Sequence, residues 1–160
     1  MLITRNRAED QETGTGTSTA DNAGAADSGG GVLDGAILEF AGGLPGFPAL
    51  RQFRLEILAP ELRPFCQMRS VDESGICFTL VAPGAVFPDY NIEIDEQHVS
   101  SLGLESADDA LVLAIVTLGE LPTANLLGPL VVNRHTRAAA QVVQYQTTHR
   151  AAEPLTSPST

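Results

Sequence analysis

The chain has 160 residues and a formal net charge of −11, and all nine of its positively charged side chains are arginines. Hydrophobic residues make up 43% of it, which is enough for one packed domain. No apolar run approaches the ~18 residues of a membrane helix. The opening MLITRNRAED has charges where a signal peptide has its apolar region. We therefore expect a cytoplasmic protein with no membrane contact.

Residues 1–7 are expected to include the first strand. Residues 8–31 contain no aromatic residue and no Val, Ile or Leu, and they are rich in Gly, Ser and Thr. Such a segment buries too little apolar surface to offset the entropy of ordering, so we expect a flexible insertion. The main β domain is expected over residues 32–146, followed by a flexible C-terminal tail at 147–160.

Short apolar runs separated by turn signals predict an all-β fold. Strands are expected at 32–40, 52–58, 64–70, 76–83, 90–95, 110–118, 128–133 and 139–146. The run at 110–118 is apolar on both faces, which is typical of a central, buried strand. The expected fold is a small β-barrel-like domain of short antiparallel strands.

One short helix is expected at residues 95–104. Asp95 is a suitable N-cap, and Val99 and Leu102 are three positions apart on one helical face.

Cys66 and Cys77 lie eleven positions apart, which is not a metal-binding or redox spacing. Free cysteine packs as a small hydrophobe, so both are expected to be reduced core residues.

Negative charge is concentrated between Asp72 and Glu120, where ten acidic residues and no arginine occur. These acids are Asp72, Glu73, Asp89, Glu93, Asp95, Glu96, Glu105, Asp108, Asp109 and Glu120. The segment repels phosphate backbones, so we expect no direct nucleic-acid binding and favour a basic protein partner. The alternative is that these acids only keep the domain in solution.

The segment GGLPGF raises the question of a phosphate-binding loop. A P-loop needs Lys and Ser or Thr after its second glycine, but Gly46 is followed by Phe47 and the chain has no lysine. Leu44-Pro45-Gly46-Phe47 instead has Pro and Gly at the two central positions of a type II turn. We therefore predict a structural turn.

The residues that could carry catalysis are scattered. The three histidines are not closely spaced, neither cysteine lies near one in sequence, and no nucleophile-elbow motif occurs. Asp108 and Asp109 could act as general acid and base, but adjacent acids more often lie in a solvated loop or helix start. We expect a non-enzymatic binding module with no metal and no cofactor.

Four segments occur in a recognisable order and spacing: LEFAGGLPGF, APGAVFPDYNIEI, LGLESADDALVLAIVTL and TANLLGPLVVN. Together they resemble the FliW family of flagellar assembly factors over Val32 to Tyr145. The resemblance implies a compact β-barrel-like fold and no catalytic activity. It also implies two partners: the RNA-binding translational repressor CsrA, which the family antagonises, and flagellin.

The resemblance further implies a partner switch. Flagellin that accumulates would occupy the protein and release CsrA to repress flagellin translation, and export of flagellin would reverse this. Two alternatives remain: a flagellin-binding chaperone without a translational role, and a small barrel enzyme using carboxylates. The family usually has a short turn where residues 8–31 stand, and Arg69 occupies a position where a neutral residue is common.

Large apolar residues in loops beside a polar anchor make good interaction hot spots. On that basis the candidate partner-binding residues are Leu44, Phe47, Phe87, Asp89, Tyr90, Asn125 and Leu126. The alternative for each is a role in the core or in a turn, such as Phe47 closing the barrel end or Asn125 bonding its own backbone.

Overall fold

The structure is a computed structural model that describes residues 2–4, 33–145 and 147–155. Its strands are β1 (Leu2–Thr4), β2 (Ile37–Phe40), β3 (Gln52–Ile57), β4 (Phe65–Ser70), β5 (Cys77–Val81), β6 (Asn91–Glu93), β7 (Ala110–Thr117), β8 (Thr123–Ala124), β9 (Leu130–Asn133), β10 (Ala138–Gln141) and β11 (Glu153–Pro154). Its helices are α4 (Pro83–Val86), α5 (Glu96–Leu102) and the 3₁₀ turns η2 (Pro60–Leu62) and η3 (Ala107–Asp109). The expected flexible insertion at 8–31 lies outside the described residues.

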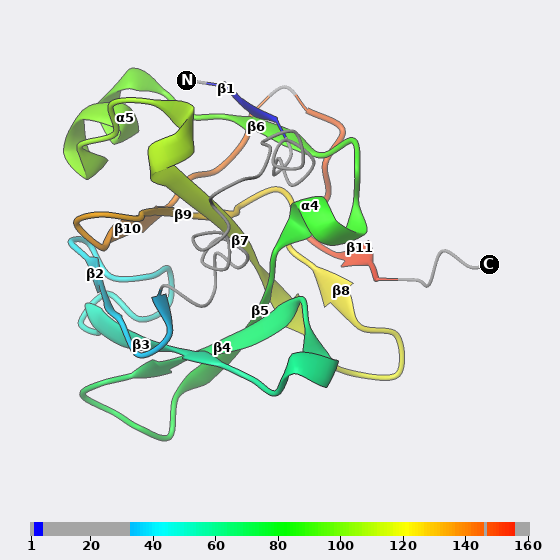
Figure 1. The fold of residues 1–160 in the computed structure, drawn as a ribbon. Coiled ribbons are helices and arrows are strands. Elements are labelled where there is room, and N and C mark those ends of the chain that lie inside the picture. The colour runs from blue at the N-terminus through cyan, green and yellow to red at the C-terminus, as the bar shows by residue number, and fades with distance from the viewer. Residues whose placement is uncertain (1, 5–32, 146, 156–160) are drawn as a thin grey trace, which may run out of the picture.

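Seven strands form a closed barrel in the order β7-β5-β4-β3-β2-β10-β9, with β9 pairing back onto β7 (Figure 1). The all-β, barrel-like prediction is confirmed. One pairing differs from the expected antiparallel pattern, because β10 runs parallel to β2. A closed ring of seven strands cannot alternate in direction at every step, so one neighbouring pair has to run parallel, and here it is the pair where β10 closes the ring onto β2.

Strand β7 separates two hydrophobic cores. We call the first the barrel core; its buried members are Leu33, Leu38, Phe40, Leu44, Leu50, Phe53, Leu55, Cys66, Met68, Leu80, Leu111, Leu113, Leu130, Val132 and Ala139. We call the second the outer core; its buried members are Val81, Tyr90, Ile92, Ile94, Leu102, Leu104, Ala110, Val112, Ala114, Val116, Ala124, Leu126, Val131 and Val142. Successive β7 side chains point alternately into the two cores, so the prediction of a strand buried on both faces is confirmed.

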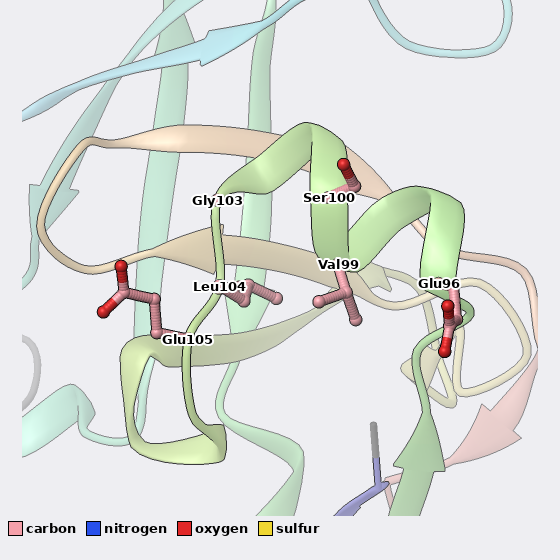
Figure 2. A pocket seen from close by; sticks show the side chains of 6 residues that line it. All are labelled: Glu96, Val99, Ser100, Gly103, Leu104 and Glu105. Carbon is pink, nitrogen blue, oxygen red and sulfur yellow. The ribbon is translucent and has the colours of Figure 1, made fainter.

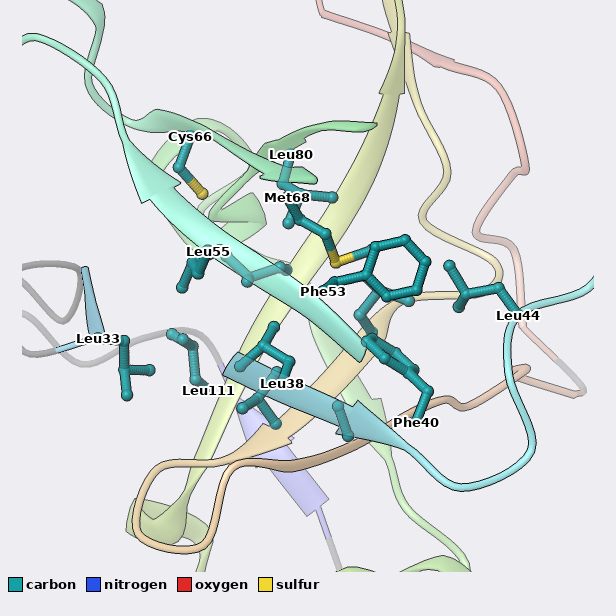
Figure 3. Close-up of a cluster of buried hydrophobic side chains, with 14 of the residues drawn as sticks. Leu33, Leu38, Phe40, Leu44, Phe53, Leu55, Cys66, Met68, Leu80 and Leu111 are labelled. Atoms are coloured by element: carbon teal, nitrogen blue, oxygen red, sulfur yellow. The ribbon is translucent and has the colours of Figure 1, made fainter. Parts of the chain in front are cut away.

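Aromatic rings pack edge to face inside the barrel core (Figure 3). The rings of Phe40 and Phe53 have centroids 5.5 Å apart at 85°, and Phe53 also lies 6.0 Å from Phe78. Phe53 and Leu55 point inward from β3 while Arg54 is exposed, as the alternation predicts. These side chains fill the barrel interior.

Helix α5 covers one side of the outer core and follows the sequence prediction closely. Asp95 is its N-cap and accepts the backbone N–H of His98 at 2.8 Å, while Gly103 ends it in the left-handed conformation at φ 68°. The four-residue α4 was not expected; Pro83 begins it at a position where a missing N–H costs nothing.

Residues 147–155 differ from the expected tail because they lie against the domain. Strand β11 pairs with β8, and the Arg150 carbonyl accepts the backbone N–H groups of Leu126 at 2.9 Å and Leu127 at 3.1 Å. The His149 ring packs on the Tyr90 ring with centroids 4.5 Å apart. Backbone hydrogen bonds provide most of the contact between residues 147–155 and the domain, and such bonds leave no hydrophobic pattern in the sequence.

Candidate partner-binding surface

The GLPGF turn closes one end of the barrel. Gly46 has φ 88°, and the Phe47 N–H donates to the Leu44 carbonyl at 2.7 Å, so the predicted turn is confirmed. Leu44 is buried in the barrel core, and the half-buried Phe47 ring packs on Phe78 at 5.8 Å. Both apolar side chains of this turn therefore contribute to packing.

The segment from Phe87 to Tyr90 lies over the outer core. Tyr90 is 4% exposed, and its hydroxyl donates to the Leu126 carbonyl at 2.8 Å. Burial raises the pKa of the Tyr90 hydroxyl. Phe87 is half-buried against the same core, whereas Asp89 is exposed.

The loop after β8 is shaped by its own asparagine. The Asn125 side-chain oxygen accepts the N–H groups of Leu127 at 3.1 Å and Gly128 at 2.8 Å. Leu126 is buried at 3% exposure. Asn125 therefore makes the local turn that was its alternative interpretation.

The seven candidates from the sequence do not form one surface. Leu44 and Phe47 lie at the barrel core, while Phe87, Tyr90 and Leu126 belong to the outer core. Tyr90 and Leu126 are brought together by their hydrogen bond. Of the seven, Asp89 is the one in the exposed class, so it is the best placed of them to meet a partner.

A pocket beside α5 was not expected from the sequence. Its volume is about 490 Å³, and it is lined by Glu96, Val99, Ser100, Gly103, Leu104 and Glu105 (Figure 2). Figure 2 shows Val99 and Leu104 between the two glutamates, so an apolar floor has a carboxylate on either side. The signals that could have indicated it were the predicted helix at 95–104 and the concentration of acids between Asp72 and Glu120.

The first turn of α5 is held by Asp95. One oxygen of its carboxylate caps the helix, and the other lies 2.8 Å from Nδ1 of His98. These bonds with His98 lower the pKa of Asp95. The acid is therefore ionised, and the start of the helix beside Glu96 is fixed.

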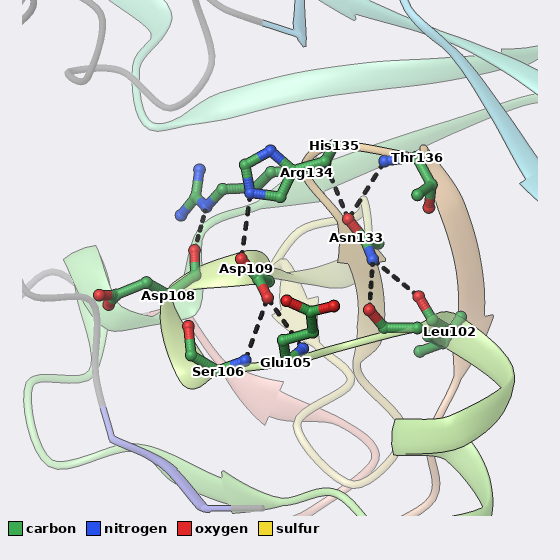
Figure 4. A network of polar contacts seen from close by, with 10 residues as sticks. Leu102, Glu105, Ser106, Asp108, Asp109, Asn133, Arg134, His135 and Thr136 are labelled. Atoms are coloured by element: carbon green, nitrogen blue, oxygen red, sulfur yellow. Dashed lines mark hydrogen bonds and ion pairs between the residues drawn. The ribbon is translucent and has the colours of Figure 1, made fainter.

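The C-terminal end of α5 is held by Asn133, which is 2% exposed (Figure 4). Its Nδ2 donates to the carbonyls of Leu102 at 2.7 Å and Gly103 at 3.3 Å. Its Oδ1 accepts the backbone N–H groups of His135 at 2.8 Å and Thr136 at 3.1 Å. One buried amide thus joins α5 to the β9–β10 turn.

Asp109 orders the loop between α5 and β7. Its Oδ2 accepts the backbone N–H groups of Glu105 at 2.9 Å and Ser106 at 3.0 Å, and its Oδ1 lies 3.0 Å from Nε2 of His135 (Figure 4). These contacts, led by the bond from Glu105, lower the pKa of Asp109. Asp109 belongs to a 3₁₀ capping box, which fits the expected helix start, although only Asp108 of the pair is exposed and Asp109 is half-buried.

The groups that the sequence offers for catalysis do not come together as a catalytic site among the described residues: Cys66 is buried, and Asp109 is held by hydrogen bonds to its own loop. Both cysteines are free, and burial raises the pKa of the Cys66 thiol to about 12, which disfavours the nucleophilic thiolate. Among the described residues, no three His, Cys, Asp or Glu side chains cluster as a metal site would require. Among the described residues, the side chains that cluster in the barrel interior are apolar, unlike the acid-lined cavity that the enzyme alternative requires.

Within the part of the chain that the structure describes, no helix has the length and apolar character needed to cross a membrane.

Known proteins match this sequence and this fold. The family model described as FliW protein matches residues 31–155. The flagellar assembly factor FliW of Bacillus licheniformis is 36% identical over 127 residues, covering 78% of this chain and 88% of the relative. That of Heliobacterium modesticaldum is 38% identical over 126 residues, covering 74% and 82%. A crystal structure of the flagellar assembly factor FliW aligns with TM-score 0.68 and 33% identity, covering 75% of this chain and 85% of that one. The chain therefore belongs to the FliW family of flagellar assembly factors.

Proposed function

We propose that this protein is a non-enzymatic, cytoplasmic regulator of flagellar assembly that exchanges two protein partners. It binds and antagonises a CsrA-type translational repressor, and it binds flagellin. Flagellin that awaits export occupies the protein and frees the repressor, and export reverses the exchange. In this way translation of flagellin follows its export.

Membership of the FliW family is the observation that carries the proposal. The charge of the chain supports it, because an RNA-binding repressor presents positive charge and this chain has a net charge of −11. Complementary charge raises the association rate and helps to fix the orientation of two proteins. The pocket beside α5 adds exposed carboxylates at one place on the surface.

The test is a titration of the purified full chain into labelled CsrA from the same organism, repeated with flagellin present. We expect saturable binding to CsrA that flagellin displaces. Binding to flagellin without binding to CsrA would contradict the translational role and leave the chaperone alternative.

A surface variant sharpens this test. Asp89→Ala removes an exposed carboxylate without touching either core, whereas alanine at Tyr90 would remove a buried ring and the bond to the Leu126 carbonyl. Tyr90→Phe keeps the ring and is the appropriate companion variant. If Asp89 contacts a partner, Asp89→Ala weakens the binding of that partner and leaves the melting temperature unchanged. Equal binding by the variant and the wild type would show that Asp89 is not part of the partner-binding surface.

A further inference from the structure

The pocket beside α5 combines an apolar floor with two exposed carboxylates, those of Glu96 and Glu105. We infer that it docks the side chain of an arginine presented by a basic protein partner, which is the translational repressor if the proposed function holds. The inference rests on the proposed function for the identity of that partner. It rests on the structure for the chemistry of the contact.

The floor of the pocket suits the stem of an arginine. Val99 is half-buried, Leu104 is 6% exposed, and Gly103 adds no side chain that would narrow the pocket. An arginine buries its three methylene groups on such a surface while its guanidinium group stays at the edge. The rim then has to supply hydrogen-bond acceptors, since a guanidinium group donates but does not accept, and carboxylates also complement its charge.

The rim supplies these acceptors. Glu96 and Glu105 are exposed, and neither side-chain carboxylate forms a hydrogen bond or an ion pair with any other described residue. Two nearby basic side chains are engaged elsewhere: Arg134 Nε donates to the Asp108 carbonyl at 3.1 Å, and His135 Nε2 lies 3.0 Å from Asp109 Oδ1. Within the described part of the chain, no arginine or histidine pairs with the two rim carboxylates, so both are available to a cation from a partner.

The pocket is also held in shape before a partner arrives. The Asp95 cap fixes the first turn of α5, Asn133 holds the carbonyls of Leu102 and Gly103, and Asp109 holds the backbone of Glu105. A site that is already ordered loses less conformational entropy on binding. The rim charges therefore stand on a fixed backbone.

The first test compares two double variants with the same change in net charge. Glu96→Gln with Glu105→Gln removes the rim charge, while Glu61→Gln with Glu73→Gln removes two exposed charges away from the pocket. We expect the rim variant to bind CsrA about tenfold more weakly, because each exposed ion pair contributes at most about fivefold. The rim variant should bind flagellin with wild-type affinity. The control variant should bind both CsrA and flagellin with wild-type affinity.

Two results would overturn the inference. One is equal CsrA binding by the rim variant and the wild type. The other is an equal loss in the rim variant and in the control, which would show a general charge effect and no specific pocket.

A second test does not depend on the proposed function. The peptide acetyl-Gly-Arg-Gly-amide is titrated into the full chain while backbone amide resonances are followed by NMR, with acetyl-Gly-Gln-Gly-amide as the neutral control. We expect the amides of Ser100, Gly103 and Glu105 to shift with the arginine peptide only, and the Glu96→Gln, Glu105→Gln variant to abolish the shift. Equal responses to both peptides, or none, would contradict the pocket even if CsrA binds; failure of the wild type to bind CsrA would contradict the proposed function alone.

Discussion

In the barrel core, aromatic side chains pack against one another. In the outer core, buried polar side chains also form hydrogen bonds with backbone groups. In the barrel, Phe40, Phe53 and Phe78 pack ring against ring. In the outer core, the Tyr90 hydroxyl reaches the Leu126 carbonyl. Gln144 behaves in the same way, because it accepts from the Glu93 N–H at 2.9 Å and donates to its carbonyl at 3.1 Å. The two cores should therefore differ in which substitutions they tolerate.

The difference explains why loops over the outer core look like interaction surfaces in the sequence. Buried backbone N–H and carbonyl groups need hydrogen-bond partners. In the outer core, the Tyr90 hydroxyl and the Gln144 amide supply such partners beside the apolar side chains. That mixture of polar anchor and large apolar residue is also the composition of a binding hot spot. The sequence pattern indicates Tyr90 and Leu126 as partner contacts for this reason, whereas both side chains are buried in the structure.

The largest effect is expected for Phe53→Ala in the barrel core. Phe53 is fully buried and contacts two other rings, so its loss should lower the free energy of unfolding by about 3–5 kcal/mol. Urea unfolding followed by circular dichroism measures this. Phe47→Ala is the matched control, because the half-buried ring at the barrel end should cost less. Equal losses in the free energy of unfolding would show that the barrel core does not depend specifically on the Phe53 ring.

A smaller effect is expected for Asn133→Ala at the outer core. The substitution leaves the buried Leu102 carbonyl without its side-chain donor and the N–H groups of His135 and Thr136 without their acceptor. We expect a loss of about 2–3 kcal/mol in the free energy of unfolding. Asn91→Ala is the control: its exposed side chain donates to the Asp89 carbonyl at 3.3 Å, the substitution keeps its backbone contacts, and the variant should stay close to wild type. A small change at Asn133 would contradict the role of backbone bonding in this core.

The smallest effect is expected for Asp95→Ala, which removes the N-cap of α5 and should cost about 1 kcal/mol at neutral pH. The pKa of Asp95 is lowered from 3.8 by its bonds with His98, so the folded state favours the ionised form. Its contribution is then full above pH 3.8 and is lost as the pH falls through the lowered value.

The pH dependence of the cap is measured by urea unfolding of wild type and Asp95→Ala between pH 7 and pH 2. The difference between the two should shrink at the acid end. A difference that stays constant across this range would show that the carboxylate charge does not support the cap.

The parts of the fold that repeat a local pattern could be predicted from the sequence. The alternation of Phe53, Leu55 and Ile57 indicated β3, and the continuous apolar run indicated β7. Asp95 indicated the start of α5 because an N-cap acts within one helical turn. In each case the physical cause lies within a few residues along the chain.

The features that the sequence does not predict depend on contacts between segments that are distant along the chain. Strands β8 and β11 have two residues each and exist because residues 147–155 fold back onto the domain, which no local pattern indicates. The pocket is similar, since its shape depends on Asn133 reaching Leu102 from 31 positions away. Half-buried loop residues such as Phe47 and Phe87 cannot be assigned to core or surface without knowing what lies against them.

Because β7 supplies side chains to both cores, the opening of either core exposes only one face of β7 and leaves the other face packed. Local fluctuations that release α5 or the C-terminal segment leave its barrel-facing side chains in place, and the reverse holds for fluctuations of the barrel hairpins. The backbone amides of β7 should therefore exchange with solvent hydrogen only through global unfolding, which places this strand, with β9, among the slowest-exchanging parts of the described chain. Its deuterium uptake would report the lifetime of the whole fold.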